Sequence, residues 1–122
     1  MRRLAACLML LTLAAALAAA ASVDGTWIAE APGRNGTVAV TFTFRSSGDA
    51  VQGYVDSQDR RHSITDGRLS GNRLTFKIVV PEGGDLFHEG IVRGQTISFS
   101  RYARLGGQAP NAPVEFTARK AN

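Results

Sequence analysis

"DGRLSGNRLTF", residues 66–76, is followed by a close copy of itself, "EGIVRGQTISF", residues 89–99. In both copies a pair of residues that begins with glycine, Gly71-Asn72 or Gly94-Gln95, interrupts an alternation of apolar and polar residues. A glycine-led pair between two alternating segments is typical of a tight β-hairpin turn. The repeat therefore predicts the same antiparallel hairpin twice.

The same alternation extends outward in both directions. Across the two turns it places Leu69 opposite Leu74 and Val92 opposite Ile97, and no window after Ser22 has helical spacing. Strands are expected near 24–30, 37–45, 50–56, 61–65, 67–70, 73–80, 86–93, 96–102 and 114–120, with the two short segments around Asp66-Gly67 as a candidate single bent strand.

Glycines mark the further turns. Asn35-Gly36 and Ser47-Gly48-Asp49 are hairpin signals. Gly67 and Gly90 lie within strand patterns, where glycine usually marks a bulge or a sharp bend. We therefore expect an interruption of the strand at both positions.

About eight sequential antiparallel strands in one domain would expose two long edges in a flat sheet, and closure removes those edges. The predicted fold is all-β: a single small antiparallel meander barrel over residues 22–122, with a flattened β-sandwich as the alternative. The apolar faces carry five phenylalanines and Trp27, and their rings are expected to fill the interior and leave no lumen. The five are Phe42, Phe44, Phe76, Phe99 and Phe116.

Residues 1–21 resemble a secretory signal peptide. Met1-Arg2-Arg3 is followed by an apolar stretch from Leu4 to Ala20 and by small residues suited to cleavage near Ala21. This predicts a secreted or periplasmic protein with no stable membrane anchor after cleavage. The only cysteine, Cys7, would be removed with the signal, so no disulfide is expected in the domain.

Charge gives little indication of a partner. Without Arg2 and Arg3 the 14 basic residues become 12, against 10 acidic ones, which leaves a net charge of +2. The basic residues are scattered rather than clustered with aromatics on one face, which argues against a nucleic-acid partner.

"DGTW" at 24–27 and "FTARK" at 116–120 resemble the first and last strands of lipocalins and their calycin relatives, and more closely a class of small secreted bacterial β domains of unknown function. The calycin resemblance implies a barrel in which Gly25 and Trp27 match the Gly-x-Trp motif and Arg119 lies across Trp27. The chain is shorter than lipocalins and lacks their cysteine pair.

No catalytic, metal or cofactor constellation stands out, and we expect a non-enzyme without a cofactor. His88 has inward parity when counted from Val92, but a bulge at Gly90 would reverse that parity and bury Phe87 instead, which is the expected outcome. Nothing in the spacing brings His62 to His88. A hydrolase would need His88 and an acid to converge in a cleft.

The leading functional hypothesis is a non-enzymatic binding or accessory module that recognises a protein or glycan through its loops, 31–36, 57–62, 81–85 and 104–113. Its alternatives are a calycin-like carrier of a small apolar ligand in the barrel interior and, more remotely, an inhibitor of a secreted enzyme. The candidate binding residues are Arg34, Arg60, Arg61, His62 and Arg104, and the structural ones are Gly25, Trp27, Gly71, Gly94 and Arg119.

Overall fold

The structure is a computed structural model that describes residues 22–33, 35–80, 84–105 and 112–121. The described chain contains strands and turns and no helix. The strands are β1 (Gly25–Gly33), β2 (Gly36–Ser47), β3 (Ala50–Ser57), β4 (Arg60–Ser63), β5 (Thr65–Ser70), β6 (Arg73–Val80), β7 (Gly84–Arg93), β8 (Thr96–Leu105) and β9 (Val114–Lys120).

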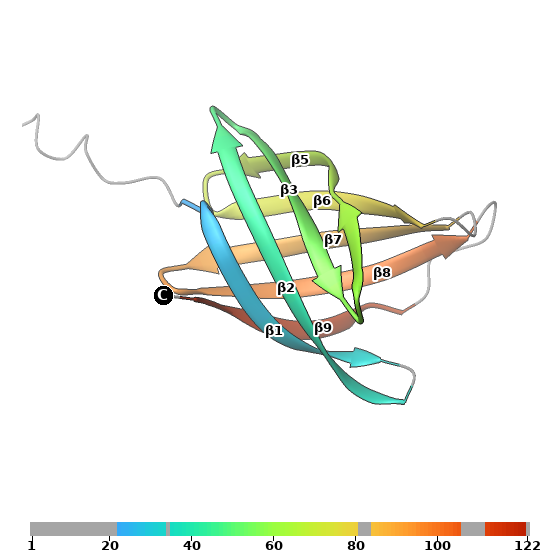
Figure 1. Cartoon of the computed structure of the whole chain (residues 1–122). Coiled ribbons are helices and arrows are strands. Elements are labelled where there is room, and N and C mark those ends of the chain that lie inside the picture. Colours follow the sequence, from blue (N-terminus) through green and yellow to red (C-terminus); the bar gives the residue numbers. More distant parts are fainter. Residues whose placement is uncertain (1–21, 34, 81–83, 106–111, 122) are drawn as a thin grey trace, which may run out of the picture.

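Eight of these strands close into an antiparallel barrel. The sheet runs β2-β1-β9-β8-β7-β6-β5-β3, and pairing of β2 with β3 completes the circle. Figure 1 shows β1, β2 and β3 crossing the strands β6, β7 and β8 that lie behind them. The remaining strand, β4, pairs with β3 alone. The predicted barrel is therefore confirmed, and the structure is not the flattened β-sandwich that was its alternative.

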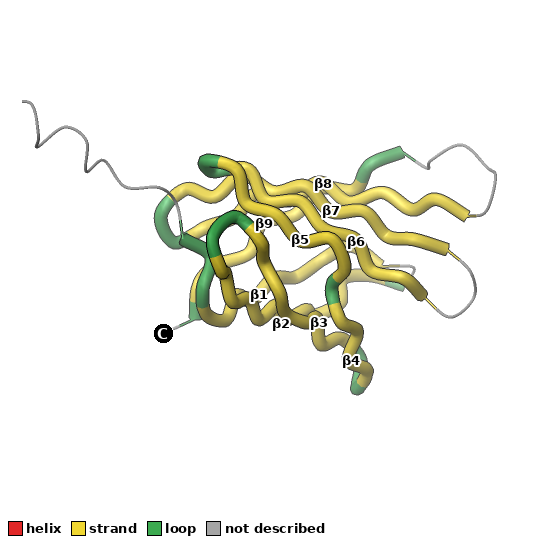
Figure 2. The backbone as a smooth tube through the Cα atoms, turned by 90° about the horizontal axis from the view of Figure 1, so that it is seen from above, coloured by secondary structure: helices red, strands yellow, loops and turns green. Residues whose placement is uncertain are grey.

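The pairing partner of β3 changes around Ile64, because the segment expected to be one bent strand divides there into β4 and β5. Residues 54–57 of β3 pair with β4, whereas Ala50 and Val51 pair with β5. The amide of Ile64 donates to the Gly53 carbonyl at 3.0 Å and bridges the two segments. Because β5 begins at Thr65, opposite Lys77, the last residues of β6 have no ladder partner on this side among the described residues. Figure 2 shows β4 as a short arm beside β3.

Both repeated hairpins are present in the predicted register. Leu69 pairs with Leu74 and Val92 with Ile97. Gly71 and Gly94 have φ values of 62° and 61°, a conformation that favours glycine. Two-residue hairpin turns place a residue of positive φ at their first position, so both glycines have the backbone conformation that the predicted turns need.

The two glycines upstream of these turns behave differently. The β5–β6 register shifts between Thr65 and Arg68, so the predicted irregularity at Gly67 is present. The prediction for Gly90 is wrong, because β7 pairs with β8 without a break from Gly84 to Arg93. A Cβ at Gly90 would lie 2.6 Å from Ile97 Cγ2 and 2.9 Å from Phe99, so glycine is needed here for space.

The uninterrupted register of β7 reverses our expectation for its side chains. His88 is buried, with 4% of its surface exposed, and Phe87 lies on the outer face, stacked on Tyr102. The five other phenylalanines are buried together in the interior, with Phe42 stacked at 4.9 Å on Phe99. Histidine thus takes a place in an aromatic core where we expected a sixth phenylalanine ring.

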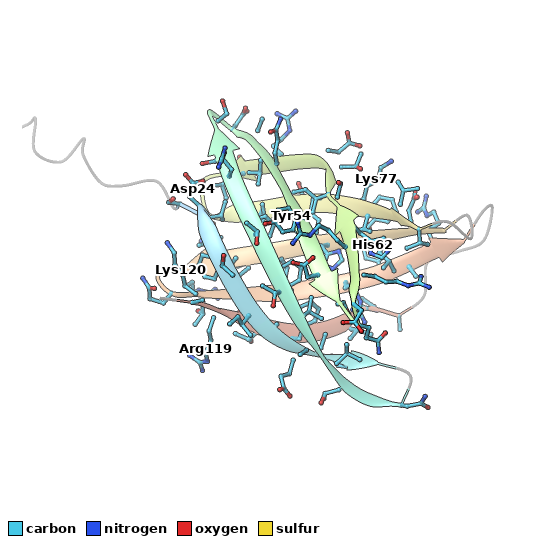
Figure 3. All side chains as sticks on the ribbon, in the orientation of Figure 1. Asp24, Tyr54, His62, Lys77, Arg119 and Lys120 are labelled. Carbon is cyan, nitrogen blue, oxygen red and sulfur yellow. The ribbon has the colours of Figure 1, made fainter. Side chains whose placement is uncertain are left out.

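One end of the barrel, which we call the closed end, is sealed around Trp27. The indole is fully buried, and its Nε1 donates to the Val23 carbonyl at 2.9 Å. Lys120 lies directly opposite Trp27 in the register, with its Nζ 5.6 Å from the indole centroid. Arg119 is exposed and opposite Ile28, so its predicted position across Trp27 is wrong by one residue, which in a strand means the other face. Lys120 and Arg119 are labelled in Figure 3.

Gly25 and Asp24 complete the closed end. Gly25 has φ 121° and lies under the Lys120 side chain, whose Cε would be 3.2 Å from a Cβ at this position. The Asp24 carboxylate accepts hydrogen bonds from the amide and hydroxyl of Ser46, at 2.6 and 2.7 Å. These bonds lower the pKa of Asp24 and hold the start of β1 against the end of β2.

Candidate binding pocket

The described side chains do not fill the interior at the other end, which we call the open end. A pocket of about 270 Å³ lies inside the wall there, so the prediction of a barrel without a lumen is wrong at this end. Its described lining is mainly apolar, with two arginines and two histidines. The lining residues are Val40, Phe42, Val55, Ser57, Gln58, Arg60, His62, Ile78, Val80, Leu86, His88, Arg101 and Phe116.

Position along the strands explains why the rings do not reach this space. Phe42 and Phe116 form the floor of the pocket. Beyond them, towards the open end, the inward positions of β2 and β6 carry Val40 and Val80, which are smaller. Short side chains at the end of a barrel leave volume that the rings nearer its middle cannot occupy.

His88 is the most enclosed polar residue of the pocket. Its ring stacks on Phe76 at 4.6 Å and 13°, and Phe42 and Phe99 meet it edge-on. Its Nδ1 is buried without a hydrogen-bond partner among the described residues. Burial lowers the pKa of His88 to about 3, the charge of Arg101 acts in the same direction, and the backbone of Leu86 opposes the shift only in part. The ring is therefore neutral at pH 7, with a polar atom left for a ligand.

Arg101 lies directly opposite His88 across the β7–β8 ladder, so both side chains are on the inner face. Its Nη2 donates to the Pro32 carbonyl at 3.1 Å, and its guanidinium lies 5.6 Å from the Phe116 ring centroid. Partial burial lowers the pKa of Arg101, though arginine remains charged at neutral pH. No carboxylate of the described chain forms an ion pair with it.

Arg101 was not identified from the sequence, although a signal was present. Ile97, Phe99 and Arg101 alternate on one strand face, which places the arginine inside whenever Phe99 is inside. The assumed bulge at Gly90 concealed its partner, because it turned His88 outward. Counting outward from the Val92–Ile97 pair gives the His88–Arg101 pair directly.

Two predicted binding residues, Arg60 and His62, do line the pocket, and β4 places His62 in the same lining as His88, contrary to expectation. The other candidates lie elsewhere. Arg61 points outward, in an ion pair with Asp56 and 3.9 Å from the Tyr54 ring centroid. Arg104 is exposed near Phe87, and Arg34 lies outside the described residues.

The chemistry of the lining limits what the pocket can do. The described residues contain no group of three histidine, cysteine, aspartate or glutamate side chains that could hold a metal ion. The described lining has no acid to accompany His88, which the hydrolase hypothesis would require. The described lining instead offers apolar surface together with arginine and histidine side chains.

A larger and more open hollow of about 850 Å³ lies over β2, β3 and β4. Its lining includes Asp24, Thr43, Gln52 and Tyr54. Figure 3 shows Tyr54 and His62 near each other on neighbouring strands, but only His62 belongs to the interior pocket. No polar side-chain atom of this described lining is both buried and unpaired, so the smaller pocket has the stronger indication of a ligand.

Comparison with known proteins adds no assignment, because the chain matches no family model, no curated protein and no solved structure at a significant level. Within the described ranges there is no helix of the length and apolar character needed to span a membrane.

Proposed function

We propose that this protein is an exported, non-enzymatic binding protein that holds a small, partly apolar ligand in the pocket at the open end of its barrel. This is the carrier alternative of the sequence analysis rather than its leading hypothesis of recognition through loops. The observation that carries the proposal is the interior pocket next to a buried histidine whose Nδ1 has no hydrogen-bond partner in the described part of the chain. A buried polar atom without a partner costs folding free energy that a ligand can recover.

The size of the pocket limits the ligand. At about 30 Å³ for each water molecule in the liquid, 270 Å³ corresponds to about nine waters. A ligand of about ten non-hydrogen atoms, such as an eight-carbon chain with one polar group, is of this size.

Two neighbouring residues of β6 allow a matched test. Val80 lines the pocket, whereas Val79 points outward and is 54% exposed. We expect Val80→Trp to fill the space and abolish binding of octan-1-ol and octanoate, measured by isothermal titration calorimetry, and Val79→Trp to leave it unchanged. Equal binding by the two variants, or none by the wild-type protein, would contradict the proposal.

Recognition of a protein or glycan on the outer wall is the second candidate. It is favoured by the large hollow beside Tyr54, whose ring lies under the Arg61 guanidinium at 3.9 Å. Tyrosine and arginine are both enriched at binding surfaces. Tyr54→Ala should weaken capture of such a partner and leave octanoate binding intact, which separates the two candidates.

A further inference from the structure

The chemical character of the ligand follows from the groups on either side of the pocket, provided that the proposed binding function holds. We propose that the pocket takes a small amphipathic anion, whose head group lies between Arg101 and His88 and whose apolar part lies against Val55, Val80 and Leu86.

The described lining of the pocket is basic. The described lining contains two arginines, Arg60 and Arg101, and no carboxylate, and the histidines His62 and His88 can also donate hydrogen bonds to an anion. Arg101 is half-buried, so its charge is less screened than that of a surface arginine. Such a lining favours a negative head group and disfavours a positive one.

The positions of Arg101 and His88 suit a single head group. Arg101 and His88 are a directly opposed pair on the inner face of β7 and β8, which brings their Cβ atoms to roughly 5 Å apart. The Arg101 guanidinium has five N–H donors, of which one, on Nη2, is bound to Pro32 in the described structure. A carboxylate placed between the two residues would accept from the guanidinium and from the His88 ring, and would provide the partner that Nδ1 lacks.

The shape of the pocket gives the rest of the ligand. Its head-group side is bounded by Phe42 and Phe116, and the remaining described lining is mostly aliphatic. Burying each CH₂ group of an alkyl chain tightens binding about fourfold, which adds affinity without adding direction. The Arg101–His88 pair would then determine which apolar molecules are selected.

Three probes of one chain length test the proposal: octanoate, octan-1-ol and octylamine. We expect the wild-type protein to bind octanoate about tenfold or more tighter than octan-1-ol, since hydrogen bonds to charged groups are the strong ones, and octylamine more weakly than either. Arg101→Met should bring octanoate to the affinity of octan-1-ol and leave octan-1-ol within about twofold. Arg104→Met, which removes an exposed arginine from the same strand, should change neither affinity.

The outcomes separate this inference from the function on which it rests. Equal binding of octanoate and octan-1-ol would overturn the charge selection and leave the pocket as a site for neutral molecules. Binding of neither probe would overturn both. If Arg101→Met does not fold, the imidazole ¹⁵N shifts of the wild-type protein decide the question. Octanoate should raise the pKa of His88 and shift its ring nitrogens, and octan-1-ol should not; unchanged ring nitrogens in octanoate would contradict the proposal.

Discussion

At the closed end of the barrel Trp27 and Val23 fill the interior, whereas at the open end Arg101 and His88 line space that no described side chain occupies. Both ends are built from the same antiparallel alternation. At the closed end the polar atom of the large side chain, Trp27 Nε1, has a backbone acceptor at 2.9 Å. At the open end His88 Nδ1 has no hydrogen-bond partner within the described ranges. We propose that the closed end stabilises the barrel and that the open end binds the ligand.

Truncation of a large side chain should show the largest difference between the ends. Trp27→Ala should lower the free energy of unfolding by about 3–5 kcal/mol, because it leaves a cavity in a sealed core. Leu86→Ala should cost at most about 1.5 kcal/mol, because this half-buried side chain already borders a pocket. Urea denaturation of the two variants measures both. Equal losses would remove the distinction between the ends.

Acid should destabilise the protein through the open end. The folded pKa of His88 is about 3 and its ordinary value is 6.5, so the unfolded state takes up a proton first as the pH falls. Stability should therefore decrease below about pH 6.5 by about 1.4 kcal/mol per pH unit, or about 3 kcal/mol by about pH 4. His88→Phe should flatten this slope in urea denaturation repeated across that pH range. A slope that persists in the variant would assign the effect to other groups.

The turns at the two ends should also respond differently. Gly71, at the closed end, has φ 62°, and Gly71→Val should cost about 1–2 kcal/mol because a branched Cβ is forced into a left-handed conformation. Asn72→Val is the control, because φ at Asn72 is not positive, and it should lower the free energy of unfolding by less. Chemical denaturation compares the two variants, and an equal cost would mean that φ at Gly71 does not decide the turn.

The smallest expected effect is a gain in stability. The β3–β4 turn at the open end places Gln58 and Asp59, with φ values of 53° and 63°, in the region that the closed-end hairpin turns reserve for glycine. Asp59→Gly should stabilise the protein by about 0.5–1 kcal/mol by relieving that conformation. We expect the midpoint of thermal unfolding to rise. A lower midpoint would show that contacts of the Asp59 side chain stabilise the protein by more than its positive φ destabilises it.

The sequence predicted most of the closed end and little of the open end, for a physical reason. Hairpin turns and alternation are local signals, so the Leu69–Leu74 and Val92–Ile97 pairs could be read directly. Whether Gly90 interrupts a strand depends on whether Phe99 occupies the space in front of it, which is a tertiary contact. That one assumption placed His88 on the wrong face and hid the pair it forms with Arg101.

The pocket itself could not be predicted from the strand pattern. Counting inward phenylalanines correctly gave five buried rings, but not their heights along the barrel. It also could not show that β4 leaves the wall and brings His62 to the same lining as His88. These features depend on how the strands cross, and alternation carries no information about the crossing.

The most direct test of the two-ended barrel is an ¹H–¹⁵N NMR titration of the protein with octanoate. We expect saturable shifts at open-end residues such as Val80, Leu86, His88 and Arg101, and an unchanged Trp27 indole N–H, because that group is bonded inside the sealed end. Shifts centred on Trp27, or on Tyr54 in the outer hollow, would contradict the placement of the binding site in the open end.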